Sequence, residues 1–168
     1  MIGVPDVLTH VLVGYSIGTL LSLRFEAVRP VHVTLVMIGA LSPDFAKIEL
    51  VFPDGFVWYV LGIPFSWSPL HTLGGTVLVV CLGALVVAPE HRRRAIALIA
   101  IGAVSHHVLD ILLLNVTGVS YAALWPLSSY RFPSLDLYLS SDRWPALVAG
   151  TIAAALWFVR HRGRSVAN

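Results

Sequence analysis

Five apolar stretches, each close to the length of a membrane-spanning helix, constrain this chain more than any other feature of its sequence. A helix needs about 20 apolar residues to cross a hydrocarbon core of about 30 Å. Hydrophobic residues make up 57% of the 168 residues and charged ones 12%, against about 25% charged in soluble domains. We therefore predict an all-α, polytopic bundle of about five transmembrane helices, forming a single integral membrane domain over residues 1–168. The predicted spans are 7–23, 31–50, 71–88, 95–114 and 144–159.

Two further segments lie between these spans. Segment 56–65 is too short to cross a bilayer and contains Pro64, and its aromatic residues indicate an interfacial or re-entrant piece. Segment 115–143 is a long aromatic loop, and we expect both segments to cover one mouth of the bundle. The single cysteine, Cys81, excludes an internal disulfide and any Cys-x-x-Cys motif. The net charge of +2 reflects few charges and gives no reason to expect a nucleic-acid partner.

The basic residues indicate the orientation of the bundle. With the loop after the first span in the cytoplasm, eight of the eleven Lys and Arg residues face inward. The reverse topology inverts this ratio, so the positive-inside rule predicts an outer N-terminus and an inner C-terminus for a multi-pass protein of the cell membrane. The eight residues are Arg24, Arg29, Arg92, Arg93, Arg94, Arg160, Arg162 and Arg164.

Ionisable side chains inside four of the spans indicate a functional site, because such groups are costly in lipid. At a rise of 1.5 Å per residue, they lie about 17–26 Å from the cytoplasmic ends of their helices, within one slab of about 10 Å. The candidates are His10, Asp44, His71, His106 and Asp110, with His107 as the alternative to His106. A small residue four positions away on each helical face would let these faces pack together. These small residues are Gly14, Ala40, Gly75 and Gly102.

Imidazole nitrogens and carboxylate oxygens at one depth are suited to a divalent transition metal, and we expect Zn²⁺. His106 and Asp110, at positions i and i+4, can reach one ion from a single helix. A metal would neutralise the buried carboxylates, and an open coordination position would supply a hydroxide nucleophile. Either aspartate could instead act as a general base. The predicted metal ligands are His10, Asp44, His71, His106 and Asp110, and the catalytic candidates are Asp44, Asp110 and His10.

Other interpretations of the same residues stay open from the sequence. Asp44 could simply pair with Lys47, three residues on. The cluster could form a structural metal site or a proton relay in a carrier, without catalysis. Histidines on facing helices could also ligate a haem, which would give the carboxylates no role. The other three histidines lie beside arginines at cytoplasmic ends and are expected to be interfacial; they are His32, His91 and His161.

Several short motifs occur in an order that resembles a known family. They are Gly-Ala-Leu-Ser-Pro-Asp at 39–44, Leu-His-Thr at 70–72, Ser-His-His-Val-Leu-Asp at 105–110, Thr-Gly-Val at 117–119, and Leu-Trp-Pro-Leu-Ser at 124–128 with Arg131. From Thr9 to Arg131 the chain resembles the YdjM-like family of inner-membrane-associated, LexA-binding, metal-dependent hydrolases. The order of its ligands also looks like that of zinc-dependent phospholipase C. The resemblance implies metal-ligand roles for His10, Asp44, His71, His106 and Asp110.

Departures from the family pattern limit what the resemblance implies. Ala46 stands where the family commonly has a second acid, and Ser66-Trp67 stands where it often has a His-Arg pair. The further His and Glu ligands of the phospholipase have no counterpart after Asp110, so we expect one metal. A site that faces outward gives no basis for LexA binding.

The resulting prediction is a membrane-bound, metal-dependent hydrolase that acts on a lipid or lipid-linked phosphoester at the extracytoplasmic interface. Membrane lipids are the expected partners. Aromatic residues at the outer mouth could receive an acyl chain; they are Trp58, Trp67, Tyr121 and Trp125. The basic residues available there to hold a phosphate are Lys47, Arg131 and Arg143.

Overall fold

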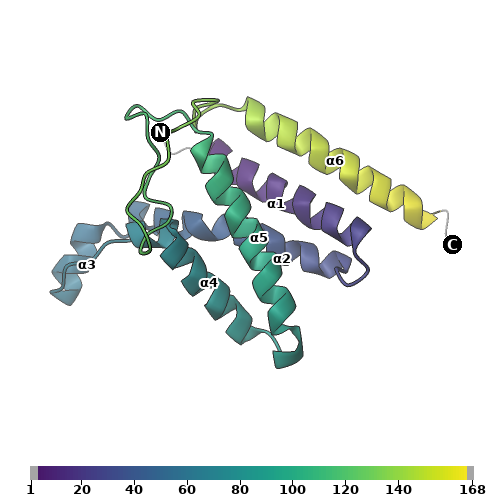
Figure 1. The fold of residues 1–168 in the computed structure, drawn as a ribbon, viewed down its shortest axis with the longest axis horizontal. Helices are drawn as coiled ribbons and strands as arrows, with labels where there is room; N and C mark the ends of the chain where they lie inside the picture. Colours follow the sequence, from purple (N-terminus) through teal and green to yellow (C-terminus); the bar gives the residue numbers. More distant parts are fainter. Residues whose placement is uncertain (1–3, 166–168) are drawn as a thin grey trace.

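Six α-helices, joined by short 3₁₀ helices and one long loop, form the structure, a computed structural model that describes residues 4–165 (Figure 1). Within this range the backbone forms two isolated bridges and no strand, so the all-α prediction is confirmed. The α-helices are α1 (Val4–Arg24), α2 (Val33–Leu41), α3 (Asp54–Leu61), α4 (Leu73–Val86), α5 (Arg92–Ile111) and α6 (Trp144–Ser165). The 3₁₀ helices are η1 (Pro30–His32), η2 (Ser42–Leu50), η3 (Ser68–His71) and η4 (Pro89–His91).

The centre of the bundle is helix α2, which packs against both α1 and α5. Helix α6 lies along α1, and α4 packs against α5 (Figure 1). At the crossing of α2 and α5 the two backbones touch. A Cβ at Gly102 would meet the carbonyl oxygen of Val36, and one at Gly39 would meet that of Ile99. Small residues allow this close approach, as is usual for helices that pack in lipid.

The predicted packing role of the small residues holds at the central crossings and is wrong at one position. Gly14 of α1 faces Ala40 of α2, where an added Cβ would lie 2.8 Å from the Ala40 Cβ. Gly75 does not face another helix, because a Cβ there would meet the backbone of Leu70 in η3, just before its own helix. Gly75 therefore lets the chain turn tightly into α4.

Three segments of the described chain are long and apolar enough to cross a membrane: Val7–Arg24, Pro30–Leu50 and Pro89–Ile111. Helix α4, in the predicted span 71–88, has only 14 residues. At 1.5 Å per residue it covers about 21 Å, which is less than a hydrocarbon core of about 30 Å. Helix α6 has 22 residues, but Arg160, His161 and Arg162 near its end lower its hydropathy. Three of the five predicted spans are thus both long enough and apolar enough to cross a membrane.

The second span changes from α2 to η2 at Ser42-Pro43, and this change places Asp44. Pro43 has no N–H to donate to the carbonyl of Gly39, and its ring would clash with that carbonyl in a continuing α-helix. The backbone N–H of Ser42 donates to Gly39 O instead, and so does Ser42 Oγ, at 2.8 Å. Residues 42–44 are buried, and the break leaves the Asp44 side chain facing His106 of α5.

The predicted loop at 115–143 contains no helix and is attached to the bundle by backbone hydrogen bonds. The first N–H groups of α4, which have no partner within the helix, donate to it. Leu73 N donates to Ala123 O at 2.7 Å, and Gly74 N donates to Trp125 O at 2.9 Å. The loop therefore covers the end of the bundle where α4 begins and α5 ends (Figure 1).

Helix α3 occupies most of the predicted interfacial segment 56–65 and projects from the bundle beyond α4 (Figure 1). Its eight residues are too few to cross a membrane. The apolar side chains of Phe56, Trp58 and Tyr59 are all exposed. Its position at the membrane interface stays a prediction.

Candidate metal centre

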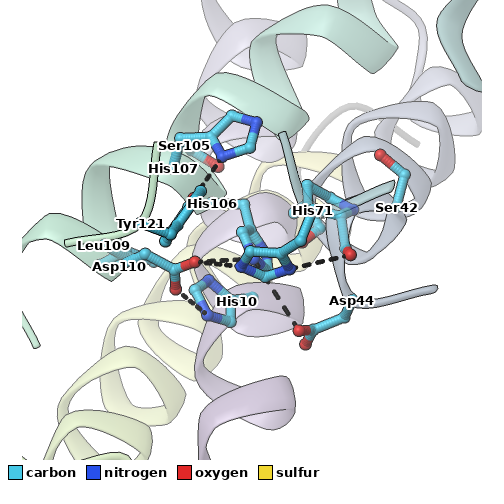
Figure 2. Close-up of polar contacts among 12 residues, drawn as sticks. His10, Ser42, Asp44, His71, Ser105, His106, His107, Leu109, Asp110 and Tyr121 are labelled. Atoms are coloured by element: carbon cyan, nitrogen blue, oxygen red, sulfur yellow. Dashed lines mark hydrogen bonds and ion pairs between the residues drawn. The ribbon is translucent and has the colours of Figure 1, made fainter. Parts of the chain in front are cut away.

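Three imidazole rings converge on the carboxylate of Asp110, close to the C-terminal end of α5 (Figure 2). His71 Nε2 lies 2.7 Å from Asp110 Oδ2, and His106 Nε2 lies 3.3 Å from the same oxygen. His10 Nε2, from α1, lies 3.3 Å from Asp110 Oδ1. His10 and His106 are fully buried and Asp110 is 7% exposed. Segments far apart in the sequence therefore bring their ring nitrogens to one buried carboxylate.

Backbone carbonyls determine which nitrogen of two of these rings carries a hydrogen. His71 Nδ1 lies 2.9 Å from Pro43 O, and His106 Nδ1 lies 2.8 Å from Ala40 O. A carbonyl oxygen only accepts, so both Nδ1 atoms are donors. In a neutral ring the Nε2 atom then carries a lone pair, and in both rings it faces a carboxylate that is also an acceptor. Such an arrangement requires a cation between the acceptors, either a proton or a metal ion.

Asp44 approaches the rings from the side opposite Asp110 (Figure 2). Its Oδ1 lies 2.7 Å from Lys47 Nζ and 3.9 Å from His106 Nε2. Asp44 therefore pairs with Lys47, the alternative that the sequence left open, and it also lies near His106. Asp44 Oδ2 and His106 Nε2 are buried and have no hydrogen-bond partner within residues 4–165. Buried polar atoms without a partner are costly, and a cation would satisfy both.

Two overlapping sets of three residues in this cluster could hold a metal ion. In each set the ligand atoms all lie within 4.8 Å of one another, and His106 belongs to both sets. Nitrogen and carboxylate donors of this kind fit a divalent transition metal such as Zn²⁺. The sets are His10, His106 and Asp110, and Asp44, His71 and His106. The structure thus brings all five residues singled out in the sequence into one cluster.

His107 belongs to a separate hydrogen-bonded group, so His106 is the histidine of this pair that contacts the carboxylate. His107 Nδ1 lies 2.6 Å from the Tyr121 hydroxyl, and His107 Nε2 lies 2.8 Å from Thr76 Oγ1 (Figure 2 shows the first contact). The Tyr121 ring packs edge-on against His71, with ring centroids 4.7 Å apart. Tyr121 therefore links this group to the cluster of candidate metal ligands.

Two site residues outside the α-helices have shifted pKa values. Burial raises the pKa of Tyr121 above its usual value and the negative charge of Asp110 raises it further, so the phenol stays protonated. Burial alone lowers the pKa of His71. The hydrogen bond to Asp110 and the charge of that carboxylate raise it more strongly, and the net shift is upward from 6.5.

A cavity of about 1020 Å³ opens beside His71. Half of the residues that line it are apolar or aromatic, and Trp125 is the largest of them. Lys47 and Arg131 add two positive charges to its wall, and Glu49 adds one negative charge. Cavities of this size hold small molecules or part of a lipid.

A second cavity, of about 270 Å³, leads to the carboxylates. It is lined by Asp44 and Asp110 together with His71 and Tyr121. His71 and Tyr121 line the larger cavity as well. A molecule in the larger cavity would therefore lie next to the cluster of candidate metal ligands.

The ring geometry argues against His10 and His106 as the two axial ligands of a haem. His10 and His106 stack with centroids 3.8 Å apart and an interplanar angle of 21°. Axial haem ligands lie on opposite faces of the porphyrin, with the iron between them. Two stacked rings at this separation leave no room for a macrocycle.

Comparison of the sequence with models of known protein families identifies the family of the chain. The family model described as YdjM inner membrane protein matches residues 6–167. The chain belongs to the YdjM family. This membership and the three apolar helices establish it as a membrane protein. Comparisons with curated proteins and with solved structures gave no significant match.

Two hydrogen-bonding residues beside the cluster of this YdjM family member were not identified from the sequence. Tyr121 was expected only as an apolar contact, because the position of a long loop does not follow from periodicity. Thr76 was not considered at all. It is the one hydroxyl-bearing residue of α4, and this isolated polar group in an apolar helix is a signal that the sequence does contain.

Proposed function

We propose that this protein is a membrane-embedded, metal-dependent hydrolase that binds one divalent metal, with Zn²⁺ as the first candidate. One observation carries the proposal: the Nε2 atoms of His71 and His106 face the Asp110 carboxylate while backbone carbonyls hold their Nδ1 atoms. Metal-binding histidines are commonly oriented by such a second hydrogen bond. The proposed ligands are His10, Asp44, His71, His106 and Asp110.

When bound, a divalent metal acidifies water and polarises the bond to be cleaved. The side chains of this chain have separate tasks. Asp110 lies within 3.3 Å of three imidazole rings through its two oxygens and would hold the metal together with them. Asp44 lies at the smaller cavity with Oδ2 available to accept a proton from the attacking water. His10 stacks on His106 and fixes the plane of that ring.

The substrate that we propose is a lipid or a lipid-linked phosphoester. The apolar and aromatic wall of the large cavity, including Trp125, suits an acyl or isoprenyl chain. Lys47 and Arg131 on the same wall suit a phosphate. A site within a membrane protein receives such amphiphiles directly from the bilayer, where the apolar chain already lies in the hydrocarbon core and the phosphate at the interface.

We further propose that α4 and α6 complete a five-span topology, with the N-terminus outside and the C-terminus inside. The support is the placement of arginine-rich turns at one end of the helices and of the His and Asp cluster at the other. A phosphatase fused after residue 125 should be active, and one fused after residue 92 should be inactive. The opposite pattern would reverse the orientation and place the site toward the cytoplasm.

Elemental analysis of the protein purified in detergent tests the metal, and thin-layer lipid assays test the reaction. From cells grown with zinc and manganese, we expect about one metal ion per chain. Metal-dependent turnover of a phospholipid or an isoprenyl phosphate would support the hydrolase. Stoichiometric metal without turnover would favour a structural metal site or a carrier. Substoichiometric metal in the wild type would overturn the proposal.

A further inference from the structure

A second hydrogen-bonded chain, made of residues outside the proposed ligand set, ends at the cavities. Thr76 Oγ1 lies 2.8 Å from His107 Nε2, and His107 Nδ1 lies 2.6 Å from the Tyr121 hydroxyl. The three residues come from α4, α5 and the loop at 115–143. Both nitrogens of His107 are engaged in this chain, and metal binding gives the ring no role.

The chain holds the Tyr121 side chain between the metal-binding cluster and the cavities. The Tyr121 ring contacts His71, and Tyr121 lines both the larger and the smaller cavity. Its backbone is fixed as well, because Tyr121 O accepts from Ala123 N at 2.8 Å and Ala123 O accepts from Leu73 N of α4 at 2.7 Å. A side chain held at both ends loses little conformational entropy when it binds a ligand.

The direction of the hydrogen bonds decides whether Tyr121 has a hydrogen left to donate. If Thr76 donates to His107 Nε2, then His107 Nδ1–H donates to the Tyr121 oxygen, and the phenolic hydrogen can point toward the Asp110 carboxylate or into the cavity. In the other tautomer of His107, the phenol donates to the ring and offers a ligand only its lone pairs. An oxyanion in the cavity accepts hydrogen bonds, so it would select the first arrangement.

We infer that Tyr121 is a substrate-binding residue, whose hydroxyl donates a hydrogen bond to a phosphate oxygen held beside the metal-binding cluster. His107 and Thr76 are positioning residues that orient this hydroxyl. Phosphate is the ligand class because Lys47 and Arg131 line the same cavity as Tyr121 and outnumber Glu49, the one acidic residue of that wall. The inference rests on the proposed function and specifies how the site would hold its substrate.

Titration of inorganic phosphate into the zinc-loaded and the zinc-free protein in detergent, followed by calorimetry, tests the inference. Tyr121→Phe removes only the hydroxyl and should weaken phosphate binding about 10- to 100-fold, as expected for a hydrogen bond to a charged group. Zinc content and the thermal midpoint should stay at the wild-type values. Tyr130→Phe is the matched control, because it makes the same change in the same loop at a residue that is 58% exposed. It should leave phosphate affinity unchanged.

A pair of substitutions at Thr76 tests the positioning role of the chain. Thr76→Val keeps the shape of the side chain and removes its hydroxyl, so we expect a loss of phosphate affinity smaller than that of Tyr121→Phe. Thr76→Ser keeps the hydroxyl and should restore the affinity. If Thr76 served packing alone, the two variants would change the thermal midpoint and leave phosphate affinity as it was, which would overturn its assignment.

The outcomes separate this inference from the proposed function. Equal phosphate affinity in Tyr121→Phe and the wild type would overturn the inference and leave the metal-dependent hydrolase standing. Loss of zinc in Tyr121→Phe would also overturn it, because Tyr121 would then support the metal site. Tyr121-dependent phosphate binding by a wild-type protein that takes up no zinc when zinc is supplied would uphold the inference and remove the metal-dependent function. Absence of phosphate binding by the wild type would overturn the inference directly.

Discussion

The seven histidines of this chain divide between the two ends of the bundle and differ in almost everything except their chemistry. At the end covered by the loop, His10 and His106 are fully buried and face a carboxylate. At the arginine-rich end, His161 is exposed and bonds to Trp157 of its own helix, and His32 bonds to the neighbouring backbone at Arg29. The comparison teaches that depth and a carboxylate partner, and not residue type, distinguish a candidate ligand from a residue of the membrane surface.

The largest effect on metal affinity and stability should come from substitutions in the buried cluster of His and Asp residues. His106→Ala and Asp110→Asn should each lower metal affinity by more than about 100-fold, since loss of even an outer-shell partner costs about 10- to 100-fold. Each should also lower the free energy of unfolding by about 3–5 kcal/mol, because the remaining partners stay buried without compensation. Metal content by elemental analysis and thermal unfolding in detergent measure the two effects.

Matched changes at exposed positions provide the controls for these variants. His32→Ala and His161→Ala remove histidines from the arginine-rich end and should lose neither metal nor stability. Asp136→Asn neutralises an exposed loop aspartate and keeps the oxygen that accepts from Ser134 Oγ at 2.6 Å. If these controls lost as much metal as His106→Ala, the distinction between the two ends would be wrong.

The second effect concerns the helix crossing one turn away from His106. Gly102→Ala places a Cβ against the carbonyl oxygen of Val36, so α2 and α5 must move apart. We expect a loss of about 1–3 kcal/mol, the usual range for overpacking. Gly55→Ala in α3 meets no atom within 4 Å and should instead stabilise the helix by up to about 1 kcal/mol. Thermal midpoints with the same sign for both variants would contradict the close-packed crossing.

The third effect is a dependence of metal affinity on pH. The pKa of His71 lies above 6.5, and a protonated ring cannot bind a metal. As the pH falls through this pKa, each binding event must release a proton, so affinity should fall by up to about tenfold per pH unit. Competition with a chelator at pH 8 and pH 6, corrected for protonation of the chelator, measures the change. His161→Ala should leave the profile unaltered, and a flat profile would remove His71 from the ligand set.

The smallest expected effect on metal affinity distinguishes the two aspartates of the cluster, Asp44 and Asp110. Asp44 shares its Oδ1 with Lys47 and lies 3.9 Å from the closest imidazole nitrogen, whereas Asp110 contacts three rings. We therefore expect Asp44→Asn to lower metal affinity by about tenfold, the lower end of the range for a secondary partner. Metal titration of the two aspartate variants side by side makes the test. An equal loss of metal affinity in both variants would show that Asp44 contributes to metal binding as much as Asp110 does.

Helical geometry explains why the cluster could be anticipated from the sequence. A rise of 1.5 Å per residue converts distance along the chain into depth, and four helices then placed His10, Asp44, His71 and the pair on α5 at one level. The i, i+4 spacing of His106 and Asp110 also predicted their contact, which is 3.3 Å in the structure. These are local rules, and they apply directly to His10 in α1 and to the pair on α5, whereas Asp44 and His71 lie in the 3₁₀ helices η2 and η3.

Features that depend on the chain between helices could not be anticipated in the same way. Tyr121 reaches the cluster because backbone hydrogen bonds attach the loop to the start of α4. The length of α4 depends on Thr72, whose extended backbone starts the helix two residues later than the apolar pattern indicates. Hydrophobic periodicity predicts neither the position of Tyr121 nor the start of α4. It indicates which residues avoid water, and it does not indicate how a loop folds back.

The local ion pair between Lys47 and Asp44 has a consequence for the order in which the protein is made. Asp110 leaves the ribosome 66 residues after Asp44, a delay of roughly 3–13 s at about 5–20 residues per second. During that interval the newly inserted Asp44 has neither α5 nor a metal to balance its charge. Lys47, only three residues away, is present almost at once and can serve as a temporary counter-ion. We therefore expect Lys47, which also borders the finished cluster, to balance the charge of Asp44 until α5 is in place.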